Sequence, residues 1–225
     1  KPSSREAFGS VGAGSETQPV NHVRAGAPPM LLIMGFGAQL TLWPDELVEA
    51  LASRGFRVIR YDNRDIGLSH KFDGVKAPGL VKMTLLSKLG LKPKVPYTLA
   101  DMADDGAGLL DTLGIEKAHI VGASMGGMIA QHFVSRHADK CLSLTTIFST
   151  TGNPKLPPTK PEAMKALVTR PDSTDEKVLV EHGMMVARTI GSPGYPTEDE
   201  RLRERTTASV RRSFYPEGPT RHLSA

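Results

Sequence analysis

Short apolar runs alternate with amphipathic segments along the first part of the chain. Residues 30–34 form a continuous apolar run, which is typical of a strand buried on both faces. Residues 43–54 carry apolar side chains at helical spacing, and residues 56–61 are rich in β-branched and aromatic side chains. This pattern predicts a strand, a helix and a second strand, in that order.

The same alternation continues through the next third of the sequence. Thr98 and Asp101 have the spacing of a capping box, which predicts the start of a helix. The elements predicted after this helix are a third buried strand at residues 118–121, a long helix at 125–137 and a fourth strand at 142–148. Because strands and helices alternate, we expect the α/β fold class, with a parallel sheet and crossover helices.

Prolines end this alternation after residue 149, and from residue 162 to 214 the chain reads as short amphipathic helices. We therefore expect a core domain at residues 1–150 and a helical lid or cap at residues 151–225. Residues 1–29 are rich in Gly, Ser and Pro, a composition that favours loops.

Composition and charge exclude several classes of protein. The 225 residues are 39% hydrophobic, which is enough for a substantial core, and no apolar run approaches the roughly 20 residues of a transmembrane helix. The net charge of +4 comes from scattered side chains, so no nucleic-acid-binding patch stands out. The single cysteine, Cys141, rules out an intrachain disulfide and favours a cytoplasmic location, although a chain that begins at Lys1 is also compatible with a processed N-terminus.

The most specific chemical signal is a G-x-S-x-G motif at residues 122–126. It lies directly after the strand predicted at 118–121 and directly before the helix predicted at 125–137. This context predicts a nucleophile elbow, a strained turn that lifts the hydroxyl of Ser124 above the carboxyl edge of the sheet. Ser124 is therefore the candidate nucleophile.

Two backbone amides are candidates for an oxyanion hole beside this serine. The N–H of Met125 lies at the start of the predicted helix, where the helix dipole favours negative charge. The second candidate is the N–H of Phe36, between Gly35 and Gly37, although these two glycines are also compatible with a simple turn. The glycines at 122–127 could instead form a nucleotide-binding loop, but the Lys-Ser/Thr pair and the G-x-G-x-x-G order of such loops are absent.

Four segments carry motifs of one known family, namely LLIMGFGAQ at 31–39, RYDNRDIGLS at 60–69, YTLADMADD at 97–105 and GASMGGMIAQ at 122–131. From about Met30 to its end the chain resembles the α/β-hydrolase superfamily. It is most similar to the group that includes aclacinomycin methylesterase and the mycobacterial lipase-esterases. The resemblance implies an α/β-hydrolase fold with a helical lid and a Ser, acid, His triad. In that triad Ser124 is the nucleophile, and Met125 and Phe36 contribute the oxyanion hole.

The chain departs from this family in one respect. In the family the acid and the histidine follow strands beyond the lid, so we expect both to lie outside these 225 residues, together with the C-terminal strands. The histidines that are present are interpreted as packing or surface residues: His22, His70, His119, His132, His137, His182 and His222. A relocated base at His222, in what reads as a polar tail, is the alternative. The charged residues Asp62, Arg64 and Asp65 are interpreted as a salt-bridged turn, with substrate contact as the alternative.

The predicted function is hydrolysis of carboxylic esters through an acyl-enzyme on Ser124. The alternative is a catalytically incomplete fragment or a non-enzymatic hydrolase-like binding protein. Dehalogenases and epoxide hydrolases of the superfamily carry aspartate at the elbow, so Ser124 argues against them. We expect a small-molecule ester as the partner and no cofactor, metal, nucleic acid or membrane segment. Because the predicted sheet ends at its fourth strand, we also expect self-association through an exposed sheet edge.

Overall fold

The computed structural model describes residues 26–79, 85–86, 89, 91, 94–153 and 155–225. Most of the segment predicted to form N-terminal loops, residues 1–25, lies outside this range. The chain divides into two compact units, one that runs up to Thr151 and includes Glu217–Ala225, and one that comprises Gly152–Pro216. No helix in the described part of the chain is long and apolar enough to span a membrane.

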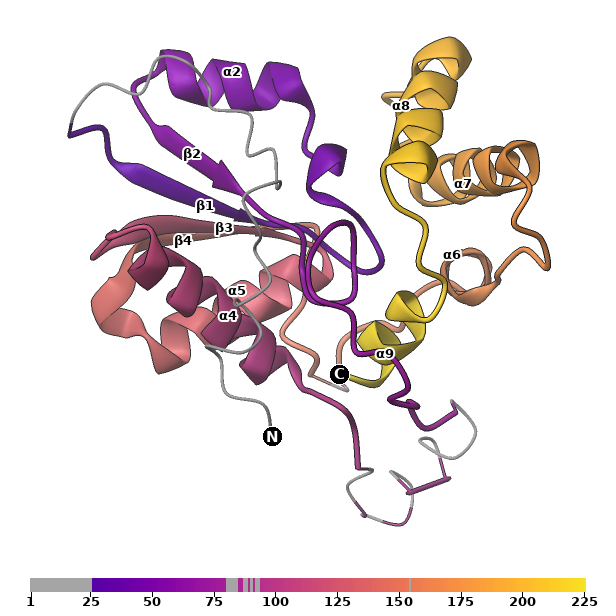
Figure 1. Ribbon diagram of the computed structural model, residues 1–225, viewed down its shortest axis with the longest axis horizontal. Coiled ribbons are helices and arrows are strands. Elements are labelled where there is room, and N and C mark those ends of the chain that lie inside the picture. Colours follow the sequence, from indigo (N-terminus) through magenta and orange to yellow (C-terminus); the bar gives the residue numbers. More distant parts are fainter. Residues whose placement is uncertain (1–25, 80–84, 87–88, 90, 92–93, 154) are drawn as a thin grey trace. The chain divides into compact units, whose positions relative to one another are not determined.

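A four-stranded sheet forms the centre of the first unit (Figure 1). Its strands are β1 (Pro29–Ile33), β2 (Arg57–Arg60), β3 (Ala118–Ala123) and β4 (Cys141–Ile147). They lie in the spatial order β2, β1, β3, β4, and each neighbouring pair is parallel. The four segments predicted as strands are therefore confirmed as strands of one parallel sheet.

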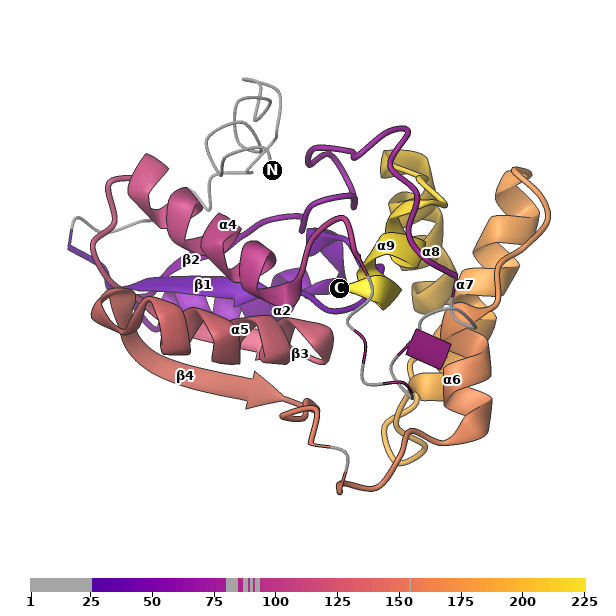
Figure 2. The ribbon, with the colours of Figure 1, turned by 90° about the horizontal axis from the view of Figure 1, so that it is seen from below.

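Helices cover both faces of this sheet (Figures 1 and 2). Helix α2 (Asp45–Ser53) lies on one face, and α4 (Leu99–Thr112) and α5 (Met125–Arg136) lie on the other. Along β1, Leu31 and Ile33 belong to the core beneath α4 and α5, whereas Leu32 and Met34 belong to the core beneath α2. The continuous apolar run of β1 thus supplies two cores at once, which is why it shows no polar alternation.

The capping box predicted ahead of α4 is present. The Thr98 side chain accepts a hydrogen bond from the Asp101 N–H at 3.2 Å, and the Thr98 N–H donates to the Asp101 carboxylate at 2.8 Å. Two backbone amides that a helix leaves unsatisfied at its start are thereby paired. Gly114, with φ of 65°, takes the left-handed conformation that follows the last residues of this helix.

Strand β4 forms one edge of the sheet. Among the described residues only β3 pairs with it, and its Leu142 and Leu144 side chains are 48% and 40% exposed. An exposed apolar edge strand is a surface on which another strand can pair. The self-association predicted from the sequence would use this edge, and it stays a prediction.

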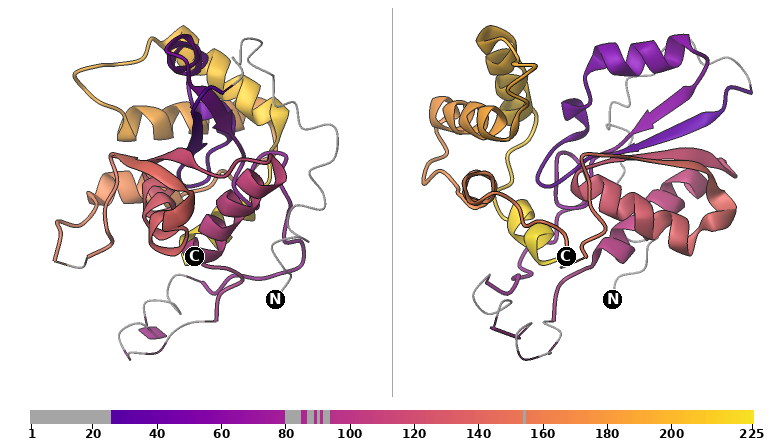
Figure 3. Two further views of the ribbon diagram at one scale, coloured as in Figure 1. Left: turned by 90° about the vertical axis from the view of Figure 1, so that its left-hand side faces the viewer. Right: turned by 180° about the vertical axis from the view of Figure 1, so that it is seen from behind.

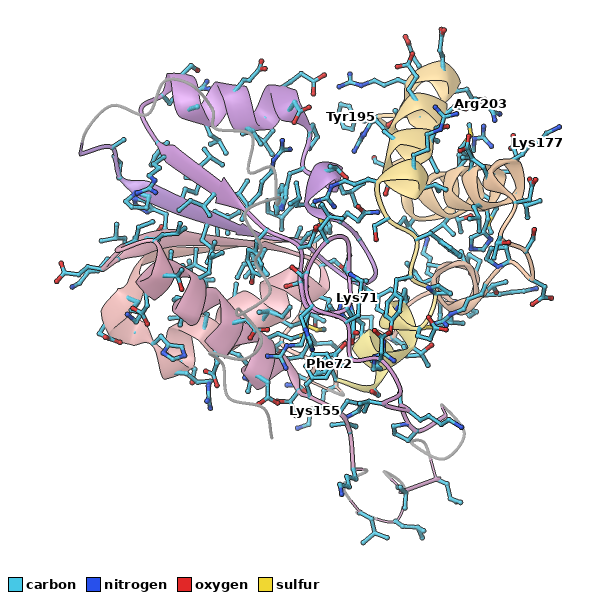
Figure 4. The ribbon with its side chains drawn as sticks, viewed as in Figure 1. Lys71, Phe72, Lys155, Lys177, Tyr195 and Arg203 are labelled. Atoms are coloured by element: carbon cyan, nitrogen blue, oxygen red, sulfur yellow. The ribbon has the colours of Figure 1, made fainter. Side chains whose placement is uncertain are left out.

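The second unit is helical and contains α6 (Pro161–Val168), α7 (Glu176–Ile190) and α8 (Asp199–Arg212). Val180, Met184 and Leu202 form its small core. Arg203, labelled on α8 in Figure 4, pairs with Glu181 of α7 at 2.6 Å. The mixed charges of α8 thus belong to a solvent-facing helix, as the sequence predicts.

The last helix, α9 (Gly218–Ser224), belongs to the first unit, so the lid range predicted at 151–225 extends too far at its C-terminal end. Figures 1 and 3 show α9 at the end of the sheet to which the strands point. Arg221 of α9 forms a two-pronged ion pair with Asp65, at 2.8 and 2.9 Å, and both side chains are buried. This ion pair attaches α9 to the loop after β2.

Candidate active site

Ser124 occupies the turn between β3 and α5. Its backbone has φ of 54° and ψ of −123°, a conformation that side-chain-bearing residues rarely adopt and that costs about 1–3 kcal/mol. The Ser124 N–H donates to the Ile147 carbonyl at 2.9 Å, which ties the turn to the end of β4. The residue is exposed, so the turn presents its side chain to solvent at the carboxyl edge of the sheet.

The glycines on both sides of Ser124 allow this turn to form. A Cβ on Gly122 would lie 2.2 Å from the Gly126 carbonyl oxygen, and a Cβ on Gly126 would lie 2.1 Å from the Ile33 carbonyl oxygen. Both distances are far below van der Waals contact. A side chain at position 122 would therefore collide with the start of the helix that follows the elbow, and one at position 126 would push the elbow away from β1. The G-x-S-x-G spacing thus has a steric origin in the packing of the turn against the sheet.

Met125 is the first residue of α5, and its amide lies next to the strained turn. The structure gives this N–H no hydrogen-bond acceptor among the described residues. The first amides of a helix have no partner within the helix and carry the positive end of its dipole. The Met125 N–H is therefore available to an anion that forms beside Ser124.

The loop after β1 lies against the same turn. A Cβ on Gly35 would lie 2.9 Å from the Ala123 carbonyl oxygen and 3.0 Å from the Ser124 Cβ, so only glycine lets the two segments approach this closely. The next residue is Phe36, whose N–H also has no acceptor within the part of the chain that the structure describes. The structure thus brings the three residues predicted for the site, Ser124, Met125 and Phe36, into neighbouring turns.

His222 has both ring nitrogens engaged away from Ser124. Its Nδ1 accepts from the Gly37 N–H at 3.3 Å, and its Nε2 lies 2.8 Å from the Arg64 carbonyl oxygen, to which it must donate. The side chain is 3% exposed, and this burial lowers the pKa of His222 to about 4. In this arrangement His222 does not offer a free nitrogen to act as a base for the serine.

The charged turn after β2 is largely satisfied from within the protein. The Asp62 carboxylate accepts from the backbone amides of Leu40 and Leu68, at 2.7 and 2.9 Å. The Arg64 guanidinium pairs with Asp105 at 2.6 Å. These contacts are those of a salt-bridged turn, which the sequence analysis favoured over a substrate contact.

Asp65 is the most deeply buried member of this turn. It accepts from the Tyr97 hydroxyl at 2.7 Å in addition to its ion pair with Arg221. Burial by itself would raise the pKa of Asp65, but the Arg221 guanidinium and the other donors hold it below its ordinary value. The carboxylate therefore remains charged and holds α9 in place.

Two other histidines lie far from the elbow along their elements. His119 precedes Ser124 by five residues on β3, roughly 16 Å of extended strand. Its Nδ1 lies 2.8 Å from the Ser143 hydroxyl. His137 follows α5, whose length separates it from Ser124 by about 18 Å, and it contacts Asp104 at 2.8 Å. Both positions agree with the interpretation of these histidines as packing or surface residues.

The role of α9 is not apparent from the sequence. The residues around His222 read as a polar tail, whereas Arg221 and His222 are 4% and 3% exposed. The partner of Arg221 is Asp65, which lies 156 positions earlier, and no local pattern links two residues so far apart. Only Gly218 and Pro219, at the start of a short helix, could have suggested an ordered element there.

Comparisons with known proteins support the fold described above. Residues 28–186 match the family described as alpha/beta hydrolase fold. A rhodomycin D methylesterase from Streptomyces sp. strain C5 is 29% identical over 197 residues, which cover 79% of this chain and 59% of that protein. The chain therefore spans less than two thirds of the length of this relative.

The chain is also similar in structure to solved hydrolases. A carboxylesterase structure from the thaumarchaeon Nitrososphaera gargenis matches with a TM-score of 0.60 and 20% identity, covering 90% of this chain and 65% of that one. A thermophilic esterase from Thermogutta terrifontis matches with a TM-score of 0.54 and 26% identity, covering 86% and 61%. Several of the proteins that share this arrangement of sheet and helices are thus described as esterases.

Proposed function

The chain belongs to the alpha/beta hydrolase fold family, and from this premise we propose that it cleaves carboxylic esters through an acyl-enzyme on Ser124. One observation carries the proposal. Ser124 is exposed in a strained conformation, with φ of 54°, between the loop of Phe36 and the Met125 amide, which has no acceptor within the described ranges. A protein maintains such strain when the surrounding structure requires it, which is typical of active sites.

The proposed reaction has two halves. The Ser124 oxygen attacks the ester carbonyl carbon while a base removes its proton, and the carbonyl oxygen becomes an anion that the Met125 and Phe36 amides stabilise. The tetrahedral intermediate then expels the alcohol, which takes up the proton. Water attacks the acyl-enzyme by the same route, releasing the acid and restoring the serine.

The base and its carboxylate partner are proposed to come from sequence outside these 225 residues. His222 has both nitrogens engaged, and His119 and His137 lie at the wrong ends of their elements. The methylesterase relative is longer than this chain, which leaves room for such residues in a whole protein of similar size.

The relatives also suggest which esters to test first. A rhodomycin D methylesterase is named for the methyl ester of a larger molecule. We therefore include in the proposal a substrate with a small alcohol on a bulky acid. Pocket shape decides such selectivity, so a series of methyl, ethyl and butyl esters of one acid is the direct comparison.

Replacement of the nucleophile tests the proposal. In the whole protein that carries these residues, Ser124→Ala should lower kcat for p-nitrophenyl acetate by at least about a thousandfold, since the acyl-enzyme cannot form. Ser53→Ala is the matched control, because Ser53 is an exposed serine at the end of α2 whose hydroxyl donates to the Ala50 carbonyl of the same helix. Undiminished turnover in Ser124→Ala would refute the assignment.

The second candidate function is that of a catalytically incomplete, hydrolase-like binding protein. It is favoured by the Ser124 hydroxyl, which has no hydrogen-bond partner among the described residues. A serine without a base is a weak nucleophile, so a fluorophosphonate probe should label the 225-residue chain far more slowly than the whole protein. Equally slow labelling of both would favour the binding protein, whereas rapid labelling of the whole protein at Ser124 would exclude it.

A further inference from the structure

Helix α9 contacts the loops that follow β1 and β2. Pro219 lies against Gly37, where an added Cβ would approach its ring to 3.3 Å, and Gly218 lies so close to Asp65 that a Cβ would be 2.3 Å from the Asp65 carbonyl oxygen. The buried pair of Arg221 and Asp65 fixes the helix on the second of these loops. The phenyl ring of Phe72, labelled in Figure 4 on the chain that follows β2, packs 5.2 Å from the Tyr97 ring beside this network.

The hydrogen bonds of His222 define its chemical form. The Gly37 N–H can only donate, so Nδ1 must be unprotonated, and the Arg64 carbonyl can only accept, so Nε2 must carry the hydrogen. The neutral ring with its proton on Nε2 is the one form that satisfies both neighbours. A protonated ring would place an N–H against the N–H of Gly37.

The loop after β1 is held at two positions by different contacts. Gly35 is held against Ser124 by close packing, and Gly37 is held against α9 by His222 and Pro219. Phe36 lies between these two fixed points, and its ring centroid is 6.3 Å from that of His222. Because the Gly37 amide is already occupied, the Phe36 amide is the one that remains for an oxyanion.

The geometry points to His222 as a positioning residue for ester hydrolysis, which holds the Gly37 amide and thereby aims the Phe36 amide at the oxyanion. This inference rests on the proposed function and adds a residue to it. His222 does not touch the substrate in this role. It acts through the loop after β1, so its loss should lower kcat more than it changes KM.

Two substitutions separate the two hydrogen bonds of the ring. In His222→Asn, the side-chain oxygen can occupy the place of Nδ1 and accept from Gly37. In His222→Gln, the terminal amide nitrogen can occupy the place of Nε2 and donate to Arg64, but nothing accepts from Gly37. The pair is matched in polarity, so the acceptor toward Gly37 is the main difference between the two variants.

Kinetics on the whole protein give the first measurement. We expect His222→Asn to keep kcat for p-nitrophenyl acetate within about threefold of the wild type. His222→Gln should lose about tenfold or more with KM little changed, as when an oxyanion donor is displaced. Equal kcat values in the two variants, or losses that follow only their melting temperatures, would overturn the inference.

Amide exchange gives a second measurement that does not depend on activity. In ¹H–¹⁵N spectra the Gly37 amide should exchange slowly in the wild type and in His222→Asn, and faster in His222→Gln. Unchanged Gly37 exchange in His222→Gln would overturn the inference even if the protein hydrolysed no ester. Persistent turnover in Ser124→Ala would instead refute the proposed function, so the two failures are distinguishable.

Discussion

Mild acid should destabilise the first unit through His222. The ring is buried, and burial lowers its pKa from the ordinary 6.5 to about 4. The Arg64 carbonyl and the Asp65 carboxylate favour the charged form, whereas the Arg221 and Arg64 guanidinium groups oppose it. The folded protein therefore keeps the ring neutral over a range of pH in which the unfolded chain takes up a proton.

The sign and size of the effect follow from this difference. Between pH 6.5 and 4 the unfolded chain binds more protons at this position than the folded chain, so stability falls as pH falls. Two pKa values of 6.5 and about 4 give a loss relative to pH 7 of about 1 kcal/mol at pH 5.5 and about 2 kcal/mol at pH 4.5. Above about pH 6.5 the ring is largely neutral in both states, so this loss of stability disappears.

Urea unfolding of the wild type and of His222→Asn at several pH values between 7.5 and 4.5 measures this loss. Asparagine does not titrate, so the difference between the two curves removes the contributions of the other histidines. The buried carboxylate of Asp65 contributes in a lower window, because its pKa lies below its ordinary value of 3.8 and its stabilisation is lost only as pH falls further. If the two free energies of unfolding stay parallel from pH 7.5 to 4.5, the reasoning about His222 is refuted.

Three further predictions concern the turn, the α9 anchor and the sheet edge. Gly126→Ala should destabilise the protein by more than about 2 kcal/mol in urea unfolding and abolish hydrolysis, because its Cβ would lie 2.1 Å from the Ile33 carbonyl oxygen. Near-native stability and activity would contradict the steric argument. Arg221→Met should lower the free energy of unfolding by about 3–5 kcal/mol, because it leaves the buried Asp65 carboxylate without its ion-pair partner. Adding Asp65→Asn should restore part of this loss, and no restoration would speak against the ion pair. The 225-residue chain should self-associate through β4, which light scattering measures as an increased mass. Leu144→Lys, at a residue that is 40% exposed, should reduce this mass, and an unchanged mass in the variant would exclude β4 as the site of association.

The order of the elements could be predicted from the sequence because it depends on local pattern. The apolar run that became β1 and the capping box of Thr98 act over a few residues, and each was found where predicted. The G-x-S-x-G motif is local in the same sense. Its two glycines and the strand before it were sufficient to predict the strained turn at Ser124.

The placement of α9 could not be predicted in this way. Its bonds join Arg221 to Asp65 and His222 to Gly37, pairs that are separated by 156 and 185 residues. Polar side chains at the end of a sequence usually remain solvated, so the composition of this segment suggested a tail. The cost of burying an arginine and a histidine is offset only by partners that the fold brings to them.

The sequence by itself therefore determined the four strands, the helices α2, α4 and α5 and the elbow that exposes Ser124, because periodicity, capping and glycine sterics operate between near neighbours. Only the tertiary structure decided that Gly35 packs against the elbow and that His222 occupies the Gly37 amide. These contacts depend on the parallel order of the strands, which brings the loops after β1, β2 and β3 to the same edge of the sheet. The physical reason is that hydrogen bonds and close packing between distant segments exist only once the chain has folded.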